Sequence, residues 1–268
     1  MGLLISATQP DGEQERLIFD CSYSLTNPPG GVQQHTEAHI PEAQYIALDR
    51  DLIAKPDSEG RHPLPEREIL GEKLRERGTN KNSTIVCYDQ NTGAYVTRMW
   101  WILRWLDHDD VYVLDGWKAV GLPTETITRR TEPGNFTAKD PLTRIWKTEN
   151  LTDADSKLID AREVERFLGI EETVDRVAGH IPGALFAAFI DNFKGRYFRF
   201  SEELRLRFTD LLSGRAMTDK IICYCDSGVT ATHNIFALMH TGFDEPALYP
   251  GSWSHWITDP KRPIATGQ

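Results

Sequence analysis

One cysteine stands where a short apolar run gives way to a small polar turn. Ile221–Tyr224 has the β-branched, apolar character of a buried strand in a parallel sheet, and Cys225 ends it. The apolar spacing after residue 231 is that of one face of a helix. A thiol at a strand-to-helix turn lies among backbone N–H groups at the positive end of the helix dipole, and both favour the thiolate. Cys225 is therefore predicted to be an acidic, nucleophilic cysteine. The other cysteines suit buried apolar positions: Cys21, Cys87, Cys223.

The elements around this cysteine have counterparts earlier in the chain, in the same order. His180-Ile181-Pro182 repeats His39-Ile40-Pro41, and the strand that ends at Cys225 repeats a strand that ends at Asp89. Short apolar strands alternate with helices in both halves, which predicts an α/β fold with a parallel sheet flanked by helices in each. Repetition of long segments predicts internal duplication of one domain. Because the Asp89 carboxylate cannot act as a thiolate or carry sulfur, only the C-terminal copy is predicted to be catalytic.

The predicted domains are an inactive N-terminal domain at 1–125 and a catalytic C-terminal domain at 156–268. Residues 126–155 are rich in Thr, Pro, Gly and charge, with weak periodicity, which indicates a linker.

Charge and composition exclude several classes of protein. The formal net charge of −10 argues against a nucleic-acid or anionic-membrane partner. The four irregularly spaced cysteines form neither a disulfide framework nor a zinc set, so neither metal nor cofactor is expected. The sequence has no apolar run of membrane-spanning length, and its start lacks the features of a signal peptide, so a cytoplasmic location is predicted. The start fits a loose myristoylation pattern, but Leu3–Ile5 is better interpreted as an edge strand.

Taken together, these motifs resemble the tandem rhodanese family, the thiosulfate and 3-mercaptopyruvate sulfurtransferases. The resemblance covers nearly the whole chain. It rests on the paired His-Ile-Pro motifs, the Asp-for-Cys exchange, the loop 225–230 and the ending 249–256. It implies two rhodanese domains, the first inactive, with the active site at their interface.

The two residues after the cysteine indicate the subtype. In this family, thiosulfate enzymes usually carry Arg and Lys there, and mercaptopyruvate enzymes usually carry Gly and Ser. Here the pair is Asp226 and Ser227. Ser227 favours 3-mercaptopyruvate as the sulfur donor, and thiosulfate remains the alternative. Asp226 matches neither type. Because a carboxylate beside a thiolate raises the thiol pKa, Asp226 is expected to point to solvent.

The resemblance also implies groups that bind the donor. Arg166 and Arg176 fall where two arginines hold the substrate carboxylate and carbonyl, which suits bidentate guanidinium binding. The alternative for Arg166 is a surface ion pair with a nearby glutamate. Arg162 and Arg196 are weaker candidates for binding the donor. The N–H groups of the loop would stabilise the anionic sulfur: Asp226, Ser227, Gly228, Val229, Thr230.

A Ser-His-Asp arrangement is implied by the positions of Ser227, His62 and Asp49. It could protonate the departing enolate or help to deprotonate the incoming thiol. The alternative for His62 is an exposed loop histidine. His39 and His180 recur in both halves and are interpreted as structural, and His233 is expected to pack or cap.

The predicted mechanism is covalent. The Cys225 thiolate takes sulfur from 3-mercaptopyruvate, which gives pyruvate and a persulfide, and the outer sulfur then passes to thioredoxin, glutathione, another small thiol or cyanide. A cysteine phosphatase is excluded because its anion-binding loop ends in Arg, where this chain has Ala231. A non-catalytic persulfide carrier or scaffold remains the alternative from another class.

Overall fold

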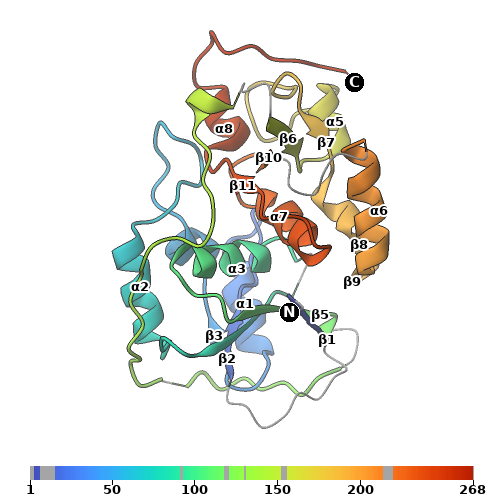
Figure 1. Cartoon of the computed structure of the whole chain (residues 1–268). Coiled ribbons are helices and arrows are strands. Elements are labelled where there is room, and N and C mark those ends of the chain that lie inside the picture. The colour runs from blue at the N-terminus through green and yellow to red at the C-terminus, as the bar shows by residue number, and fades with distance from the viewer. Residues whose placement is uncertain are drawn as a thin grey trace. The chain divides into compact units, whose positions relative to one another are not determined.

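The computed structural model describes residues 3–6, 16–90, 93–117, 121–129, 131–151, 156–213 and 220–267, and these are the residues considered below. They form two compact units (Figure 1). The N-terminal unit comprises Met1–Ala54, Leu64–Leu142 and Gly195–Phe198. The C-terminal unit comprises Lys55–Pro63, Thr143–Lys194 and Arg199–Gln268. Each unit therefore contains a short segment from the other half of the sequence. The predicted linker is divided between the units, and the predicted boundaries at 125 and 156 stay predictions.

The N-terminal unit is built on a five-stranded sheet with the order β1-β5-β4-β2-β3, in which every pair is parallel. Its central strand β4 is buried along Ile85–Tyr88, as a β-branched apolar run predicts. The first strand pairs on one side only, which confirms the predicted edge strand, whereas Met1 and Gly2 of the myristoylation pattern lie outside the described residues. The elements are β1 Leu4–Ser6, β2 Arg16–Asp20, α1 Pro29–Glu37, β3 Gln44–Tyr45, η1 Leu48–Leu52, α2 Arg67–Glu76, β4 Thr84–Tyr88, α3 Val96–Trp105, β5 Val111–Asp115 and β9 Tyr197–Phe198.

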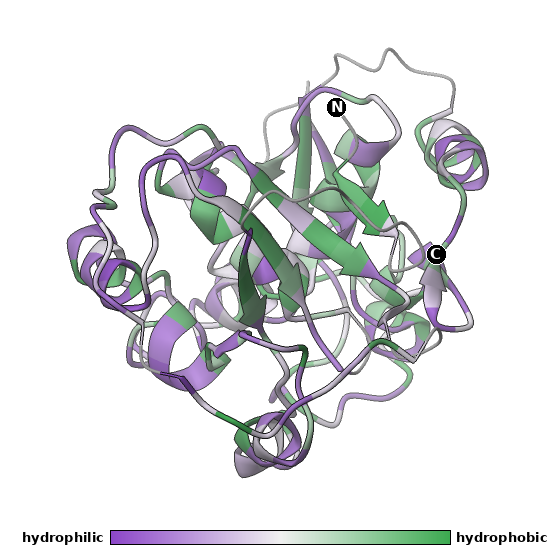
Figure 2. Ribbon diagram, turned by 90° about the horizontal axis from the view of Figure 1, so that it is seen from below, coloured by the Kyte–Doolittle hydropathy of each residue, from purple (hydrophilic) through white to green (hydrophobic). Residues whose placement is uncertain are grey.

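The C-terminal unit is built on a four-stranded parallel sheet with the order β11-β10-β6-β7. In Figure 2 many strand residues are green, whereas helices carry both purple and green, as expected of elements with one face in a core. The elements are η2 Thr148–Asn150, β6 Ser156–Asp160, α5 Val164–Leu168, β7 Leu185–Phe186, η3 Phe189–Asn192, β8 Phe193–Lys194, α6 Ser201–Leu211, β10 Lys220–Tyr224, α7 Ala231–His240, β11 Ala247–Leu248 and α8 Ser252–Trp256. The two parallel sheets confirm the predicted α/β fold.

Contacts around the His-Ile-Pro motifs are repeated in the two units. His39 Nδ1 bonds to a backbone carbonyl of its own unit at 2.6 Å, and His180 Nδ1 does the same at 2.7 Å. Both side chains are buried, which fits the structural role predicted for them. The tyrosine that ends the central strand accepts the isoleucine N–H of the motif in each unit: Ile40 N to Tyr88 Oη at 3.1 Å, and Ile181 N to Tyr224 Oη at 3.2 Å.

The residue after the motif differs between the units, and its backbone does not. Gly183 has φ 81°, and Glu42, at the equivalent position, has φ 68°. A side chain is accommodated there without strain only where φ is negative, which is not the case in either unit. Glu42 therefore adopts the left-handed conformation that disfavours side chains. Its N–H donates to Glu125 Oε1 at 2.7 Å.

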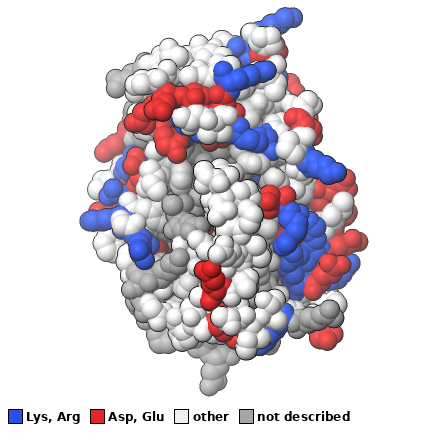
Figure 3. Space-filling view, turned by 180° about the vertical axis from the view of Figure 1, so that it is seen from behind, with Lys and Arg blue, Asp and Glu red and all other residues white. Residues whose placement is uncertain are grey.

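On the face shown in Figure 3, Lys and Arg are interspersed with Asp and Glu. Within the described ranges, every helix is too short or too polar to cross a membrane.

Candidate active site

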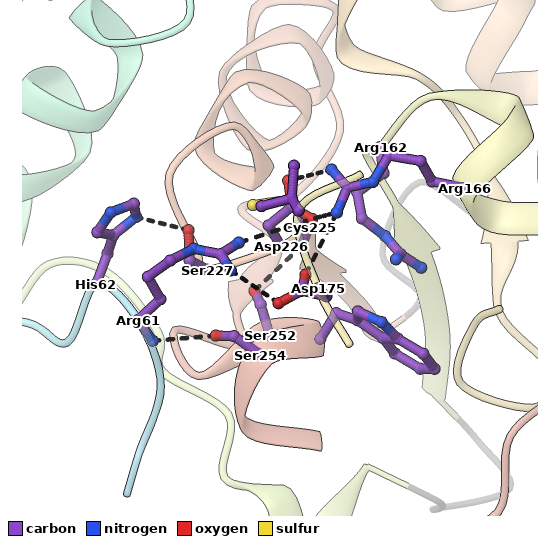
Figure 4. A network of polar contacts seen from close by, with 12 residues as sticks. Arg61, His62, Arg162, Arg166, Asp175, Cys225, Asp226, Ser227, Ser252 and Ser254 are labelled. Atoms are coloured by element: carbon purple, nitrogen blue, oxygen red, sulfur yellow. Dashed lines mark hydrogen bonds and ion pairs between the residues drawn. The ribbon is translucent and has the colours of Figure 1, made fainter. Parts of the chain in front are cut away.

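Cys225 lies at the end of strand β10, as the sequence predicts, and helix α7 begins at Ala231 (Figure 4). The thiol-bearing residue is buried. Its N–H donates to Ser252 Oγ at 3.1 Å, and its carbonyl accepts the N–H of Trp253 at 3.0 Å. Two contacts with the start of α8 thus fix the cysteine backbone.

The turn after the cysteine requires glycine at position 228. Gly228 has φ 79°, and a Cβ atom there would lie 2.5 Å from the carbonyl oxygen of Pro250. Both the left-handed backbone and this close approach exclude a side chain. The turn continues through Val229 and Thr230, whose carbonyls accept the N–H groups of Thr232 and His233. The role predicted for the loop N–H groups stays a prediction.

The structure brings His62 and Ser227 together. His62 Nδ1 and Ser227 Oγ share a hydrogen bond of 2.7 Å, and Ser227 lies two residues after Cys225 (Figure 4). Although His62 comes from the first half of the sequence, its segment Lys55–Pro63 belongs to the C-terminal unit. His62 is half-buried and hydrogen-bonded, so it is not the exposed loop histidine of the alternative.

Arg61 anchors the segment that carries His62. Its N–H donates to Ser254 Oγ at 3.1 Å, and its Nη1 donates to Asp175 Oδ1 at 2.7 Å. Just before it, Gly60 packs so closely that an added Cβ would lie 3.0 Å from the carbonyl oxygen of Gly251. Arg61 and Asp175 are not predicted from the sequence, in which the only signal is that Arg61 precedes a candidate histidine.

Asp49 lies in η1 of the N-terminal unit. There it hydrogen-bonds to Tyr23. Burial, and then the neighbouring Asp49 carboxylate, raise the pKa of Tyr23 to about 12. Because Asp49 and His62 belong to different units, the third member of the Ser-His-Asp arrangement and the location of the site at the domain interface stay predictions.

Arg166 is buried in a cluster of acidic side chains. Its Nη1 donates to Asp226 Oδ2 at 2.7 Å, and its Nη2 contacts Asp226 Oδ1. Its Nε donates to Glu172 Oε1 at 2.9 Å, and its Nη2 donates to Asp175 Oδ2 at 3.3 Å. Glu163, the surface partner considered from the sequence, is 3.7 Å away, which is farther than the other three acids. The glutamate ion pair of the alternative is therefore present, but it belongs to a buried cluster and not to the surface alone.

Asp226 corrects a second expectation. Its carboxylate was expected to point to solvent, and it instead turns to the Arg166 guanidinium, because a buried cation requires an anionic partner. Burial, with a further contribution from nearby Asp175, raises the pKa of Asp226 to about 6, although Arg166 and Arg162 act in the opposite direction. Arg166 itself has a raised pKa: desolvation lowers it, but the bonds to Asp226 and Glu172 outweigh that effect.

Of the other predicted arginines, Arg162 borders the acidic cluster, whereas Arg176 and Arg196 have no contact with it recorded among the residues that the structure describes. Arg162 is buried, forms a bidentate ion pair with Asp160, stacks over Trp253 at 4.8 Å and lies 3.6 Å from Glu172 Oε2. Arg176 is exposed, and its Nη2 donates to the carbonyl of Ile257 at 2.6 Å. No contact recorded for the described residues brings Arg176 to Cys225 or Arg166. Arg196 is exposed in the segment that belongs to the N-terminal unit.

The remaining cysteines and His233 are inert groups of the core. Cys21, Cys87 and Cys223 are buried, and burial raises the pKa of the Cys223 thiol. His233 is buried beside Asn192, and desolvation lowers its pKa to about 3, so it is neutral. It therefore packs, as predicted.

Comparison with known proteins now gives the family. The family described as "Rhodanese-like domain" matches residues 7–119 and 144–259. The chain belongs to the rhodanese family, with two domains in tandem.

Among relatives of this rhodanese, a probable 3-mercaptopyruvate sulfurtransferase of Pseudomonas aeruginosa is 44% identical, over 95% of this chain and 94% of that protein. A putative thiosulfate sulfurtransferase of Mycobacterium tuberculosis, SseB, is 34% identical over 93% and 90%. Among solved structures, the 3-mercaptopyruvate sulfurtransferase of Leishmania major has a TM-score of 0.83 at 30% identity, over 93% of this chain and 72% of that chain.

Proposed function

We propose that this rhodanese transfers sulfur from 3-mercaptopyruvate through a persulfide on Cys225 and releases pyruvate. The observation that carries this proposal is the 2.7 Å hydrogen bond between His62 and Ser227, next to the buried cysteine. A keto-acid donor leaves as an enolate that must gain a proton on carbon, and a hydroxyl paired with an imidazole can supply it. Thiosulfate leaves sulfite and needs no such proton. The relatives named sulfurtransferases support the same class of reaction.

The proposed step is a displacement at sulfur. The Cys225 thiolate attacks the thiol sulfur of the donor, an S–S bond forms, and the C–S bond breaks with its electron pair leaving on carbon. The thiol proton passes through Ser227 and His62 to that carbon. The products are pyruvate and a Cys225 persulfide anion, so atoms and charge balance without an external oxidant.

Other groups bind and stabilise in this proposal. Arg166 and Arg176 receive the donor carboxylate and carbonyl, and the N–H groups from Asp226 to Thr230 stabilise the anionic sulfur. Asp49 orients His62. The second half-reaction passes the outer sulfur to a thiol such as thioredoxin or glutathione, or to cyanide. The cytoplasmic location stays a prediction.

Mass spectrometry of the intact protein after donor treatment tests the persulfide. We expect one added sulfur on Cys225, none in Cys225→Ser, and the wild-type result in Cys223→Ser, the matched control two residues earlier on the same strand. An unmodified Cys225 in protein that releases pyruvate would contradict the proposal.

The donor is tested by comparing kcat/KM for 3-mercaptopyruvate and for thiosulfate under the same conditions. We expect the value for 3-mercaptopyruvate to be higher. The reverse order would favour the thiosulfate alternative, and failure to turn over either donor would favour a persulfide carrier.

A further inference from the structure

The guanidinium of Arg166, to which the proposed function assigns the donor carboxylate, is already occupied. Asp226 contacts both terminal nitrogens, which is the fork geometry of a bound carboxylate. Glu172 accepts a hydrogen bond from Nε of Arg166, and Asp175 accepts one from Nη2. A donor can therefore reach Arg166 only if one of these three acids leaves.

Two of the three acids are held from several sides. Glu172 Oε1 also accepts the N–H groups of Val174 and Asp175, each at 2.9 Å, and its side chain is 5% exposed. Asp175 is equally buried, and its other oxygen accepts from Arg61. Removal of either would leave several N–H donors without an acceptor.

Asp226 is the acid that can leave. Its side chain is 22% exposed, and the carboxylate contacts recorded within the described chain are to arginine side chains, at Arg166 and, at 4.0 Å, Arg61. Its backbone is fixed separately, because its carbonyl accepts the N–H of Ser254 at 2.8 Å. Rotation of the side chain would therefore free Arg166 without moving the backbone next to Cys225.

The surroundings of Asp226 also disfavour its charged form. Burial and the nearby Asp175 raise its pKa despite Arg166. Exchange of this carboxylate for that of a donor therefore replaces a poorly solvated anion with another of the same charge.

We propose that Asp226 is a specificity-determining residue that competes with the donor carboxylate for Arg166. This inference rests on the proposed function and names what limits donor binding. Three arginines (Arg61, Arg162 and Arg166) face four acids (Asp160, Glu172, Asp175 and Asp226), so the cluster carries more negative than positive charge. A monoanionic keto acid replaces Asp226 one for one, whereas the dianion thiosulfate adds a further negative charge. Asp226 therefore weakens the binding of both donors, and thiosulfate more strongly.

Asp226→Asn tests this inference, because it keeps the shape of the side chain and removes the charge. Pyruvate serves as an unreactive carboxylate probe in isothermal titration calorimetry. We expect about tenfold tighter pyruvate binding than in the wild type, which is roughly 1.4 kcal/mol. In turnover we expect a similar fall in KM for 3-mercaptopyruvate with kcat little changed, and a larger gain in kcat/KM for thiosulfate.

Glu163→Gln is the matched control, since it removes one negative charge 3.7 Å from the same guanidinium from an exposed position. Asp226→Gly is the second variant, in case the asparagine amide still holds Arg166. Equal pyruvate binding in the wild type and both Asp226 variants would overturn the inference, as would an equal gain in Glu163→Gln or no pyruvate binding by any of these proteins.

The pyruvate titration separates this inference from the proposed function. A wild type that turns over 3-mercaptopyruvate while the Asp226 variants bind pyruvate no better refutes only the role of Asp226. Tighter pyruvate binding in the variants of a protein that turns over neither donor refutes only the proposed reaction.

Discussion

The two loops that follow the central strands β4 and β10 differ in where they carry a carboxylate. In the N-terminal unit, Asp89 accepts the N–H groups of Gly93, Tyr95 and Val96 at 2.9, 3.2 and 3.3 Å, and so caps the start of α3. In the C-terminal unit the same position is Cys225, and the carboxylate is one residue later, turned to Arg166. The Asp89 carboxylate is bound by the backbone of its own loop. The Asp226 carboxylate, one position later in the second loop, is the one that we propose a donor carboxylate replaces. In the first unit these three N–H groups bind the Asp89 carboxylate, so Asp89 stabilises the fold there.

The largest expected difference between the loops is in activity. Cys225→Ser should lower kcat/KM for sulfur transfer by roughly a thousandfold or more, because the nucleophile is lost. Asp89→Cys in the same background should restore nothing, because Ser227, His62 and Arg166 all belong to the C-terminal unit. Pyruvate release measures both. Recovery of activity in the double variant would show that the two loops are interchangeable.

The next difference is in stability. Asp89→Ala removes the acceptor of three N–H groups at a helix start, so we expect a loss of about 2 kcal/mol in the free energy of unfolding. Asp89→Asn, which keeps one acceptor oxygen, should lose less. Urea denaturation with fluorescence detection gives both values. An unchanged urea midpoint for Asp89→Ala would show that the Asp89 carboxylate does not stabilise the fold.

The two carboxylates should also differ in the sign of their effect. The pKa of Asp226 is raised to about 6 in the folded chain, so the folded state binds its proton more tightly than the unfolded state does. Stability is therefore lost as the pH rises from about 4 through about 6. Asp226→Asn should remove this loss and be more stable than the wild type above that range, by about 1–2 kcal/mol at pH 8, with the advantage disappearing near pH 4. Unfolding curves at several pH values measure it, with Asp89→Asn as the control that should lose stability. Lower stability of Asp226→Asn at pH 8 would contradict the expected sign.

The smallest expected difference is in the turn after the His-Ile-Pro motif. Both copies have positive φ, but only Gly183 suits it. Glu42→Gly should stabilise the N-terminal unit and Gly183→Ala should destabilise the C-terminal unit, each by about 1 kcal/mol. A Cβ at Gly183 meets no atom within 4 Å, so the second change measures the backbone alone. Thermal midpoints of the two variants should shift in opposite directions.

Local patterns in the sequence predict the strand, turn and helix around Cys225 because each depends on neighbouring residues. The duplication is equally visible, and it could have revealed the positive φ of Glu42, since the equivalent residue is Gly183. The pairing of Arg166 with Asp226 joins residues 60 positions apart, and that of His62 with Ser227 joins residues 165 apart. The second was accessible only through the family resemblance. The first was not accessible at all, because orientation of a loop side chain depends on how a distant buried cation is neutralised.

The exchange of short segments between the halves has a consequence for inheritance. Residues 55–63 complete the C-terminal unit and residues 195–198 complete the N-terminal unit. A gene that encoded only the second half would therefore produce a protein without Arg61 and His62. Division of the chain between its halves would therefore separate each unit from a segment that packs within it.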